Sequence, residues 1–220
     1  MTAQLKIDFV SDVACPWCAV GLYSLEEALR RTNGIVNADF TFRPFELNPD
    51  LPAPGVNHHE HIAEKFGMSV DQLSSGSDML RERAADVGFT INSTAESRIY
   101  NTFDAHRLLH WAKSQGRQQE LKRALFKANF TDNLDVSSPE VLATISASAG
   151  LDAEEAREVL ASGRYATEVK TDEKLWMSRG IHAVPGIVIN GKWLISGGQP
   201  PEYFEQALRT IAAELDPQSK

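Results

Sequence analysis

Cysteine is scarce in this sequence: there are two among 220 residues, and both lie in Cys15-Pro16-Trp17-Cys18. A disulfide between residues this close would close almost no loop, so it would add little stability by restricting the unfolded chain. Two cysteines also cannot fill a zinc site unless two histidines join them. The pair is therefore better explained as a reactive dithiol than as a structural disulfide or a zinc site.

The sequence also lacks long apolar runs and blocks of like charge. No run approaches the roughly 20 apolar residues of a membrane helix, so we expect no membrane partner. The 22 Lys and Arg residues are outnumbered by 30 Asp and Glu residues, and the net charge of -8 is spread along the chain. Nucleic acid and anionic lipid are therefore poor partners. Because the first residues show no basic and apolar leader, we predict a cytoplasmic protein.

The N-terminal part has the pattern of a β-α-β unit. Alternating apolar residues predict strands at Leu5–Val10 and Ala38–Phe45. Between them a helix is predicted to begin at Cys15-Pro16, because proline suits the first position of a helix. Cys18 begins the apolar stripe of this helix, which continues through Leu22. The order predicts two parallel strands joined by a right-handed crossover.

The middle of the chain has helical patterns and no convincing strand. Amphipathic helices are predicted over 59–66, 70–87, 97–114, 118–130, 139–149, 153–161 and 167–179. Beyond them, Asn190-Gly191 separates two short apolar runs, which is the strongest short-range signal for a β-hairpin. Glu202–Leu215 is predicted to form the last helix.

Without its helical middle, the order is β-α-β followed by α-β-β-α. This is the thioredoxin arrangement, so we predict an α/β, thioredoxin-like fold with a large all-helical insertion. Residues 1–56 and 166–220 would form the discontinuous thioredoxin-like domain, and residues 57–165 would form the helical insertion domain.

Thiol-disulfide exchange needs one thiolate that attacks and a second thiol that resolves the mixed disulfide. Cys15, at the helix start, is expected to face solvent, while Cys18 lies on the buried stripe. A cysteine with a pKa of about 8.5 is mostly protonated at neutral pH. The helix dipole and hydrogen bonds from the amides of Trp17 and Cys18 to the sulfur are expected to lower the pKa of Cys15 moderately.

A second motif, Ala183-Val184-Pro185-Gly186, directly precedes the hairpin. Proline at a strand start can be plain punctuation. If the bond before Pro185 is cis, the turn would bring the backbone of Val184 beside Cys15, where it could pair with an extended substrate. Aromatic residues in strands more often pack in the core than line a groove. The candidates for an apolar substrate groove are Trp17, Phe45 and Trp193.

Two further sets of polar residues are candidates for a chemical role. His106 and His110 are one helical turn apart and could hold a metal, but they have no cysteine or carboxylate companions at ligand spacing, so no metal site is predicted. Asp12 lies three residues before Cys15. It could relay a proton during exchange or simply stabilise a turn.

Taken together, the two motifs and the helical insertion resemble the DsbA-like thioredoxin-fold family, and within it the cytoplasmic FrnE-like branch. Further matching segments are residues 44–49, 101–108 and 196–200. The resemblance implies a dithiol-disulfide oxidoreductase or isomerase in which Cys15 attacks, Cys18 resolves and Pro185 is the cis-proline opposite. The chain departs from the periplasmic DsbA pattern by having Trp17 where histidine is usual, which favours reduction or isomerisation.

A related branch contains kappa-class glutathione transferases and 2-hydroxychromene-2-carboxylate isomerases. These enzymes resemble the chain in layout and use glutathione, but they typically carry serine where this chain has Cys15. We therefore expect no bound cofactor, with glutathione as a possible reductant. The expected partners are a disulfide-containing protein or peptide and a small-molecule thiol or thioredoxin-type electron donor. A glutathione-dependent isomerase or kappa-class transferase-like enzyme and a non-redox holdase or binding protein remain alternative functions. A second copy of the chain, in a homodimer, is a further candidate partner.

Overall fold

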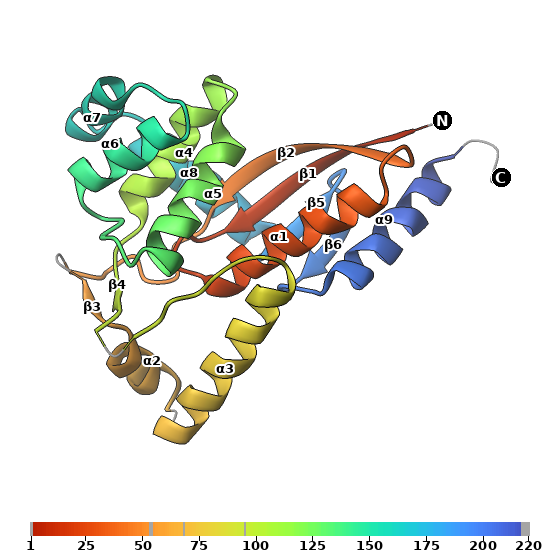
Figure 1. Ribbon diagram of the computed structural model, residues 1–220. Coiled ribbons are helices and arrows are strands. Elements are labelled where there is room, and N and C mark those ends of the chain that lie inside the picture. The colour runs from red at the N-terminus through yellow and green to blue at the C-terminus, as the bar shows by residue number, and fades with distance from the viewer. Residues whose placement is uncertain (1, 53–54, 68, 95, 217–220) are drawn as a thin grey trace.

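The computed structural model describes residues 2–52, 55–67, 69–94 and 96–216. Its centre is a four-stranded mixed sheet in the order β2-β1-β5-β6 (Figure 1). β1 pairs in parallel with β2, whereas β5 is antiparallel to both β1 and β6. The strands span Ala3–Ser11 (β1), Val36–Pro44 (β2), Gly186–Ile189 (β5) and Trp193–Ser196 (β6).

The predicted β-α-β unit and hairpin are both present. Helix α1 (Pro16–Arg31) connects the parallel strands, and β1 buries Leu5, Ile7 and Phe9 to 1% exposure or less. The hairpin turns at Asn190-Gly191, where both residues have positive φ angles of 50° and 66°. These are the backbone angles that a two-residue turn of type I′ requires.

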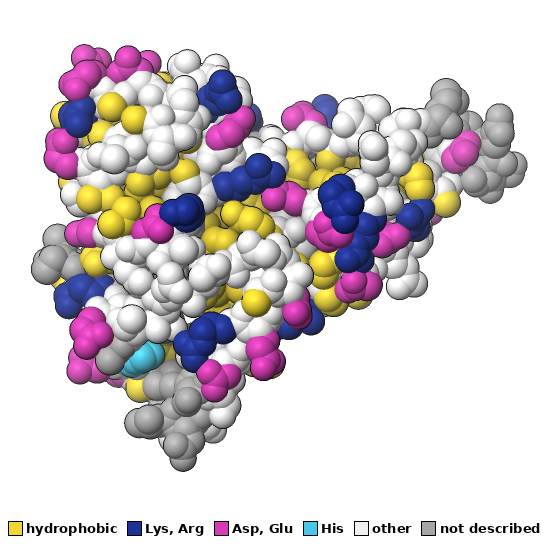
Figure 2. All heavy atoms as spheres, viewed as in Figure 1, with side chains coloured by type: hydrophobic (Ala, Val, Ile, Leu, Met, Phe, Trp, Pro, Cys, Tyr) yellow, Lys and Arg dark blue, Asp and Glu magenta, His cyan; other side chains and the backbone are white. Residues whose placement is uncertain are grey.

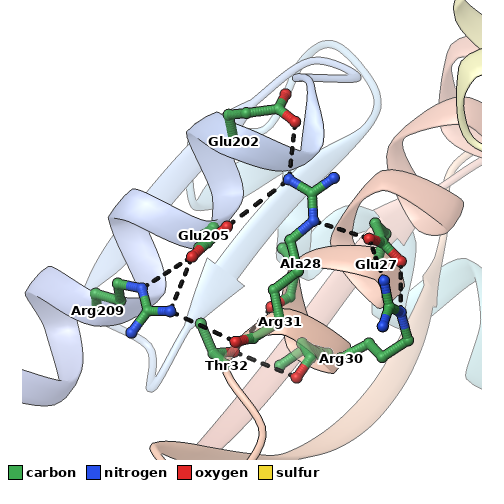
Figure 3. Close-up of polar contacts among 9 residues, drawn as sticks. Glu27, Ala28, Arg30, Arg31, Thr32, Glu202, Glu205 and Arg209 are labelled. Atoms are coloured by element: carbon green, nitrogen blue, oxygen red, sulfur yellow. Dashed lines mark hydrogen bonds and ion pairs between the residues drawn. The ribbon is translucent and has the colours of Figure 1, made fainter.

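Helix α9 (Pro201–Leu215) packs beside α1, and the two helices share one face of the sheet (Figure 1). Leu22 and Leu25 of α1 and Phe204 and Leu208 of α9 lie in the same buried cluster as the strand residues. An exposed ion network ties the ends of these helices. Figure 3 shows Arg31 between Glu27 of its own helix and the acidic side chains of α9.

The remaining helices come from the middle of the chain, as predicted. They are α2 (His58–Phe66), α3 (Val70–Asp86), α4 (Phe103–Ser114), α5 (Gln118–Phe126), α6 (Pro139–Ser148), α7 (Ala153–Ala161) and α8 (Ala166–Ser178). Figure 1 shows α4 to α7 gathered at one end of the sheet, around a second buried cluster.

Three details of the middle differ from the sequence-based expectations. The prediction that the middle of the chain has no strand is wrong, because Val56–Asn57 (β3) pairs with Arg98–Ile99 (β4). The helix expected over 97–114 therefore begins only at Phe103. The helix expected over 118–130 changes at Lys127–Thr131 into a π-helical segment, η1. Two-residue strands are too short for the period of two to be recognised in a sequence.

The helical middle and the sheet share their buried side chains. The cluster that includes the strand residues also contains Ala84, Phe89 and Phe126 from the middle of the chain. Conversely, Val13, which follows β1, lies in the cluster of α4 to α7. The predicted boundaries between two domains stay a prediction.

Charges of both signs are mixed on the surface (Figure 2), as the scattered charges of the sequence predict. Acidic and basic side chains are interspersed over the face in Figure 2, with hydrophobic side chains visible between them. Within the described ranges, no helix is both long and apolar enough to cross a bilayer.

Candidate active site

Cys15 is the N-cap of α1, and Pro16 occupies the first helical position as predicted. The Cys15 side chain makes no capping hydrogen bond. Instead, the Cys18 amide donates to the Cys15 carbonyl oxygen at 3.0 Å. The expectation that the Cys18 amide would bond to the Cys15 sulfur is therefore wrong, because this amide closes the first turn on the backbone.

Both cysteines are free thiols and lie 3.3 Å apart. Cys18 is completely buried. Burial raises the pKa of the Cys18 thiol well above its ordinary value, and the hydrogen bond and charge of Cys15 act in the same direction. The positive charge of Lys122 opposes these effects without cancelling them. Cys18 is therefore a protonated thiol at neutral pH, held next to Cys15.

Cys15 is only 5% exposed, so it is less open to solvent than the sequence suggests. Its thiol is directed at the facing loop and donates to the Val184 carbonyl oxygen, with 3.8 Å between Sγ and O. The chain neighbours of Cys15, Ala14 and Pro16, line a cavity of about 60 Å³. The Cys15 sulfur is thus covered by the Val184 carbonyl, while the residues on either side of Cys15 line the cavity.

The facing loop carries Pro185, and the Val184–Pro185 peptide bond is cis. Gly186 follows as the first residue of β5, opposite Val10 of β1. Helix α1 comes close to this loop at Gly21, where an added Cβ would lie 3.2 Å from the Pro185 ring. A side chain at Gly21 would therefore push α1 away from the loop, and glycine keeps Pro185 against the helix that carries both cysteines.

Asp12, in the loop between β1 and α1, is buried and fully hydrogen bonded. Its carboxylate accepts bonds from the Thr102 hydroxyl at 2.7 Å, the Leu47 amide at 2.7 Å and the Ala14 amide at 3.1 Å. Burial acts to raise the pKa of Asp12, but the hydrogen bond and charge of His106, together with these other bonds, lower it overall. Asp12 is therefore a stable carboxylate that fixes the loop before Cys15; its part as a proton relay stays a prediction.

Lys122 of α5 was not identified from the sequence. Its side chain is completely buried, and burial lowers its pKa to about 8 against the opposing negative charges of Cys18, Asp12 and Cys15. A signal was present, since Lys122 follows Gln118 by four residues and precedes Phe126 by four, on the helix face that is buried. A lysine among the buried residues of a helix face is thus the signal that points to Lys122.

The predicted groove residues do not all come together. Phe45 and Val184 pack in one small cluster with Val10, Trp176 and Ile181. Trp17 is half-buried against the main core. Trp193 pairs with Ile189 at the far end of β5 from Gly186, in a groove lined by α9. The structure thus places Trp193 away from the cysteines.

His106 and His110, the candidate metal ligands, lie among other groups in the structure. His106 Nε2 lies 3.1 Å from the Phe45 carbonyl oxygen and 3.5 Å from an oxygen of Asp12. The ring of His110 packs against that of Tyr165. In the part of the chain that the structure describes, no three His, Cys, Asp or Glu side chains are grouped to hold a metal.

Comparison with known proteins identifies the family. The model of the DSBA-like thioredoxin domain matches residues 6–209. The chain belongs to this family. A probable DsbA oxidoreductase from Streptomyces coelicolor is 37% identical, with a TM-score of 0.89 over 96% of this chain and 91% of that one. The family supports a thiol-disulfide oxidoreductase in general, and it confirms the DsbA-like resemblance.

More distant matches also extend over most of the chain. The uncharacterized protein YwbO of Bacillus subtilis is 25% identical over 209 residues, which cover 94% of this chain and 96% of YwbO. The cytosolic disulfide reductase DsbM from Pseudomonas aeruginosa, solved with GSH, is 16% identical, with a TM-score of 0.58 over 94% of this chain and 98% of DsbM. At that identity the likeness concerns the fold alone. Placement in the FrnE-like branch, the cytoplasmic location and a homodimer stay predictions.

Proposed function

We propose that this chain is a dithiol-disulfide reductase or isomerase for disulfide-containing proteins or peptides. Cys15 would attack, Cys18 would resolve, and the Val184–Pro185 loop would face the bound substrate. The observation that carries the proposal is the pair of free thiols, 3.3 Å apart at the first turn of α1, with one sulfur against the backbone of a facing loop.

The proposed exchange has two steps. The Cys15 thiolate attacks one sulfur of the substrate disulfide and forms a mixed disulfide, while the other substrate sulfur leaves as a thiolate and takes up a proton. Cys18 then loses its proton and attacks the Cys15 sulfur, which releases the second substrate thiol and leaves a Cys15–Cys18 disulfide. Two electrons thus pass from the dithiol to the substrate.

The surroundings of the cysteines suit an ordered exchange. The high pKa of Cys18 keeps it protonated while Cys15 makes the first attack. The Val184 carbonyl oxygen beside Cys15 is an acceptor for an amide of an extended substrate segment. Reversal of the first step by a different substrate thiol would rearrange disulfides without net reduction.

A reductant must restore the dithiol after each turnover. We propose a small-molecule thiol or a thioredoxin-type protein, and glutathione is the first to test because DsbM was solved with GSH. Two glutathione molecules would supply the two electrons and leave as glutathione disulfide.

The test is reductive cleavage of insulin, and refolding of a scrambled disulfide protein, with glutathione as reductant. We expect activity from the wild-type chain, and rates at the uncatalysed level from Cys15→Ser, since a hydroxyl is not a nucleophile of comparable strength. Cys18→Ala removes the second thiol without adding a polar group to its buried site and should sharply slow net reduction of insulin, because no second thiol of the chain is left to resolve the mixed disulfide at Cys15. Full activity in both variants would refute the proposed function.

A further inference from the structure

The cavity of about 60 Å³ beside the cysteine loop is bordered by Ala14 and Pro16, on either side of Cys15. The rest of its lining comes from the middle of the chain, and helix α3, which supplies part of it, packs against α1 (Figure 1). The large apolar side chains that line it are Leu80, Ile91, Ile99 and Phe130. An apolar space therefore begins next to the residue that is proposed to attack the substrate.

This inner cavity adjoins a larger hollow that is mostly polar. Both spaces are lined by Ser97, Arg98, Asn129 and Asn133. The outer hollow has a volume of about 250 Å³, and its lining is completed by Thr94, Glu96 and Tyr100. Because Arg98 and Asn133 are exposed, the hollow reaches the surface. A ligand that enters from solvent meets polar groups first and apolar side chains behind them.

Hydrogen bonds hold the walls of the two spaces in place. The π-helical segment η1 and the residues after it form one wall, and the segment before β4 forms another. The Asn92 amide donates to the Phe130 carbonyl oxygen at 2.8 Å, and the Asn133 side chain donates to the Asn92 carbonyl oxygen at 2.7 Å. Asn129 of η1 donates to the Val13 carbonyl oxygen of the cysteine loop at 3.1 Å. The cavity is therefore formed before a ligand binds, and π-helical turns are frequent at functional sites.

The size of the inner cavity limits what it can hold. One water molecule needs about 10–15 Å³ of such space, so 60 Å³ accommodates about four groups of that size. The side chains of valine, leucine and isoleucine have three or four carbon atoms, whereas a cavity that binds benzene measures about 150 Å³. The inner cavity therefore fits one aliphatic side chain and is too small for an aromatic ring.

We propose that these two spaces bind a peptide substrate beside its disulfide, an inference that rests on the proposed function. The inner cavity takes a valine, leucine or isoleucine side chain adjacent to the cysteine that Cys15 attacks. The outer hollow takes the peptide backbone, whose amides and carbonyls suit its polar lining. An extended chain advances about 3.3 Å per residue, so a neighbouring side chain reaches a cavity that begins beside Cys15. Leu80 and Ile91 then determine which side chain is accepted.

The first test is the rate at which wild type forms a mixed disulfide with short peptide disulfides in single-turnover, rapid-quench experiments. The peptides differ only in the residue before or after their cysteine, which is glycine, valine, leucine, phenylalanine or lysine. At one of these two positions, valine and leucine should raise the rate constant about tenfold over glycine, and phenylalanine and lysine should not. Equal rate constants for glycine, valine and leucine at both positions, or a larger gain with phenylalanine, would overturn the inference.

The second test enlarges the cavity with Leu80→Ala. Leu80 is half-buried on α3, and its truncation makes room for a ring. We expect the preference to change from the leucine to the phenylalanine peptide. Met79→Ala removes a side chain of similar size from an exposed neighbouring position of α3 and should keep the wild-type preference. A wild-type preference in folded Leu80→Ala would overturn the inference, and if this variant does not fold, the wild-type series decides.

Peptides with serine in place of cysteine separate this inference from the proposed function. In calorimetry with wild type, the leucine version should bind about tenfold more tightly than the glycine version. Equal affinities would overturn the inference. A wild-type chain that forms no mixed disulfide with any peptide would overturn the proposed function, while the serine peptides would still report whether the cavity selects an aliphatic side chain.

Discussion

Asp12 and Lys122 are both buried charged residues near the cysteine pair, but the fold surrounds them in opposite ways. Asp12 accepts hydrogen bonds from one hydroxyl and two amides, whereas Lys122 Nζ has no hydrogen-bond partner among the residues that the structure describes. The pKa of Asp12 is lowered, which favours its charged form, and that of Lys122 is also lowered, which favours its neutral form. The comparison separates a charge that holds a loop in place from one that the fold buries without a hydrogen-bond partner among the described residues.

The largest expected effect on stability comes from removing Asp12, the buried charge that has hydrogen-bond partners. Asp12→Ala leaves the Thr102 hydroxyl and the Leu47 and Ala14 amides without their acceptor inside the protein. We expect a loss of about 3–5 kcal/mol in the free energy of unfolding, measured by urea denaturation. A loss below about 1 kcal/mol would show that water replaces the carboxylate and that the loop does not depend on Asp12.

Asp12→Asn is the matched control, because it keeps an acceptor oxygen and removes the charge. The native pKa of Asp12 lies below 3.8, the value expected for the unfolded chain. The stability that the carboxylate contributes is therefore complete above that pH and is lost as the pH falls through the native pKa. The difference between wild type and Asp12→Asn should shrink only below pH 3.8.

Removing the unpartnered charge should have the opposite sign and a smaller size. The pKa of Lys122 falls from 10.5 to about 8 on folding, so the buried ammonium costs up to about 3 kcal/mol below pH 8. This cost fades as the pH rises from 8 towards 10.5, because the amine is then neutral in both states. Lys122→Met should therefore increase the free energy of unfolding by about 1–3 kcal/mol at neutral pH.

The measurement is urea denaturation of wild type and Lys122→Met at neutral pH and again near pH 10, where the gain should be much smaller. Lys174→Met, at an exposed position, provides the comparison at each pH. A lower stability of Lys122→Met at neutral pH would mean that the ammonium has partners that stabilise it, and the contrast with Asp12 would no longer hold.

The smallest effect is expected from the exposed ion network of Figure 3. Arg31 contacts Glu27 and Glu202 at the surface, where water competes for every charge. Arg31→Met should change the melting temperature by no more than about 2 °C, and less at high salt. A large change would show that surface pairs, rather than buried groups, join α9 to α1.

The features predicted correctly from the sequence are those encoded by neighbouring residues. Pro16 at a helix start, the alternation in β1 and Asn190-Gly191 each specify local geometry, so the helix, the strand and the hairpin were found. Close approaches between distant segments are encoded less directly. The approach of the Val184 backbone to Cys15 was predicted only on the condition that the bond before Pro185 is cis, and the structure has both the cis bond and the contact. The burial of Lys122 was not predicted.

The misplaced candidate illustrates the same limit. Trp193 was a candidate groove residue because of its aromatic side chain, yet the register of β6 on β5 places it beside Ile189. Register depends on the turn and on the pairing of whole strands, and a single aromatic residue carries no information about it.

The central claim is that Cys15 attacks a substrate disulfide and Cys18 resolves the product. The most direct measurement is mass spectrometry of Cys18→Ser after reaction with a peptide disulfide, beside wild type and Cys15→Ser. The account predicts one peptide joined to Cys15 in Cys18→Ser, no lasting adduct on wild type and none on Cys15→Ser. An adduct on Cys18 of the Cys15→Ser variant, with none on Cys15 of Cys18→Ser, would contradict it.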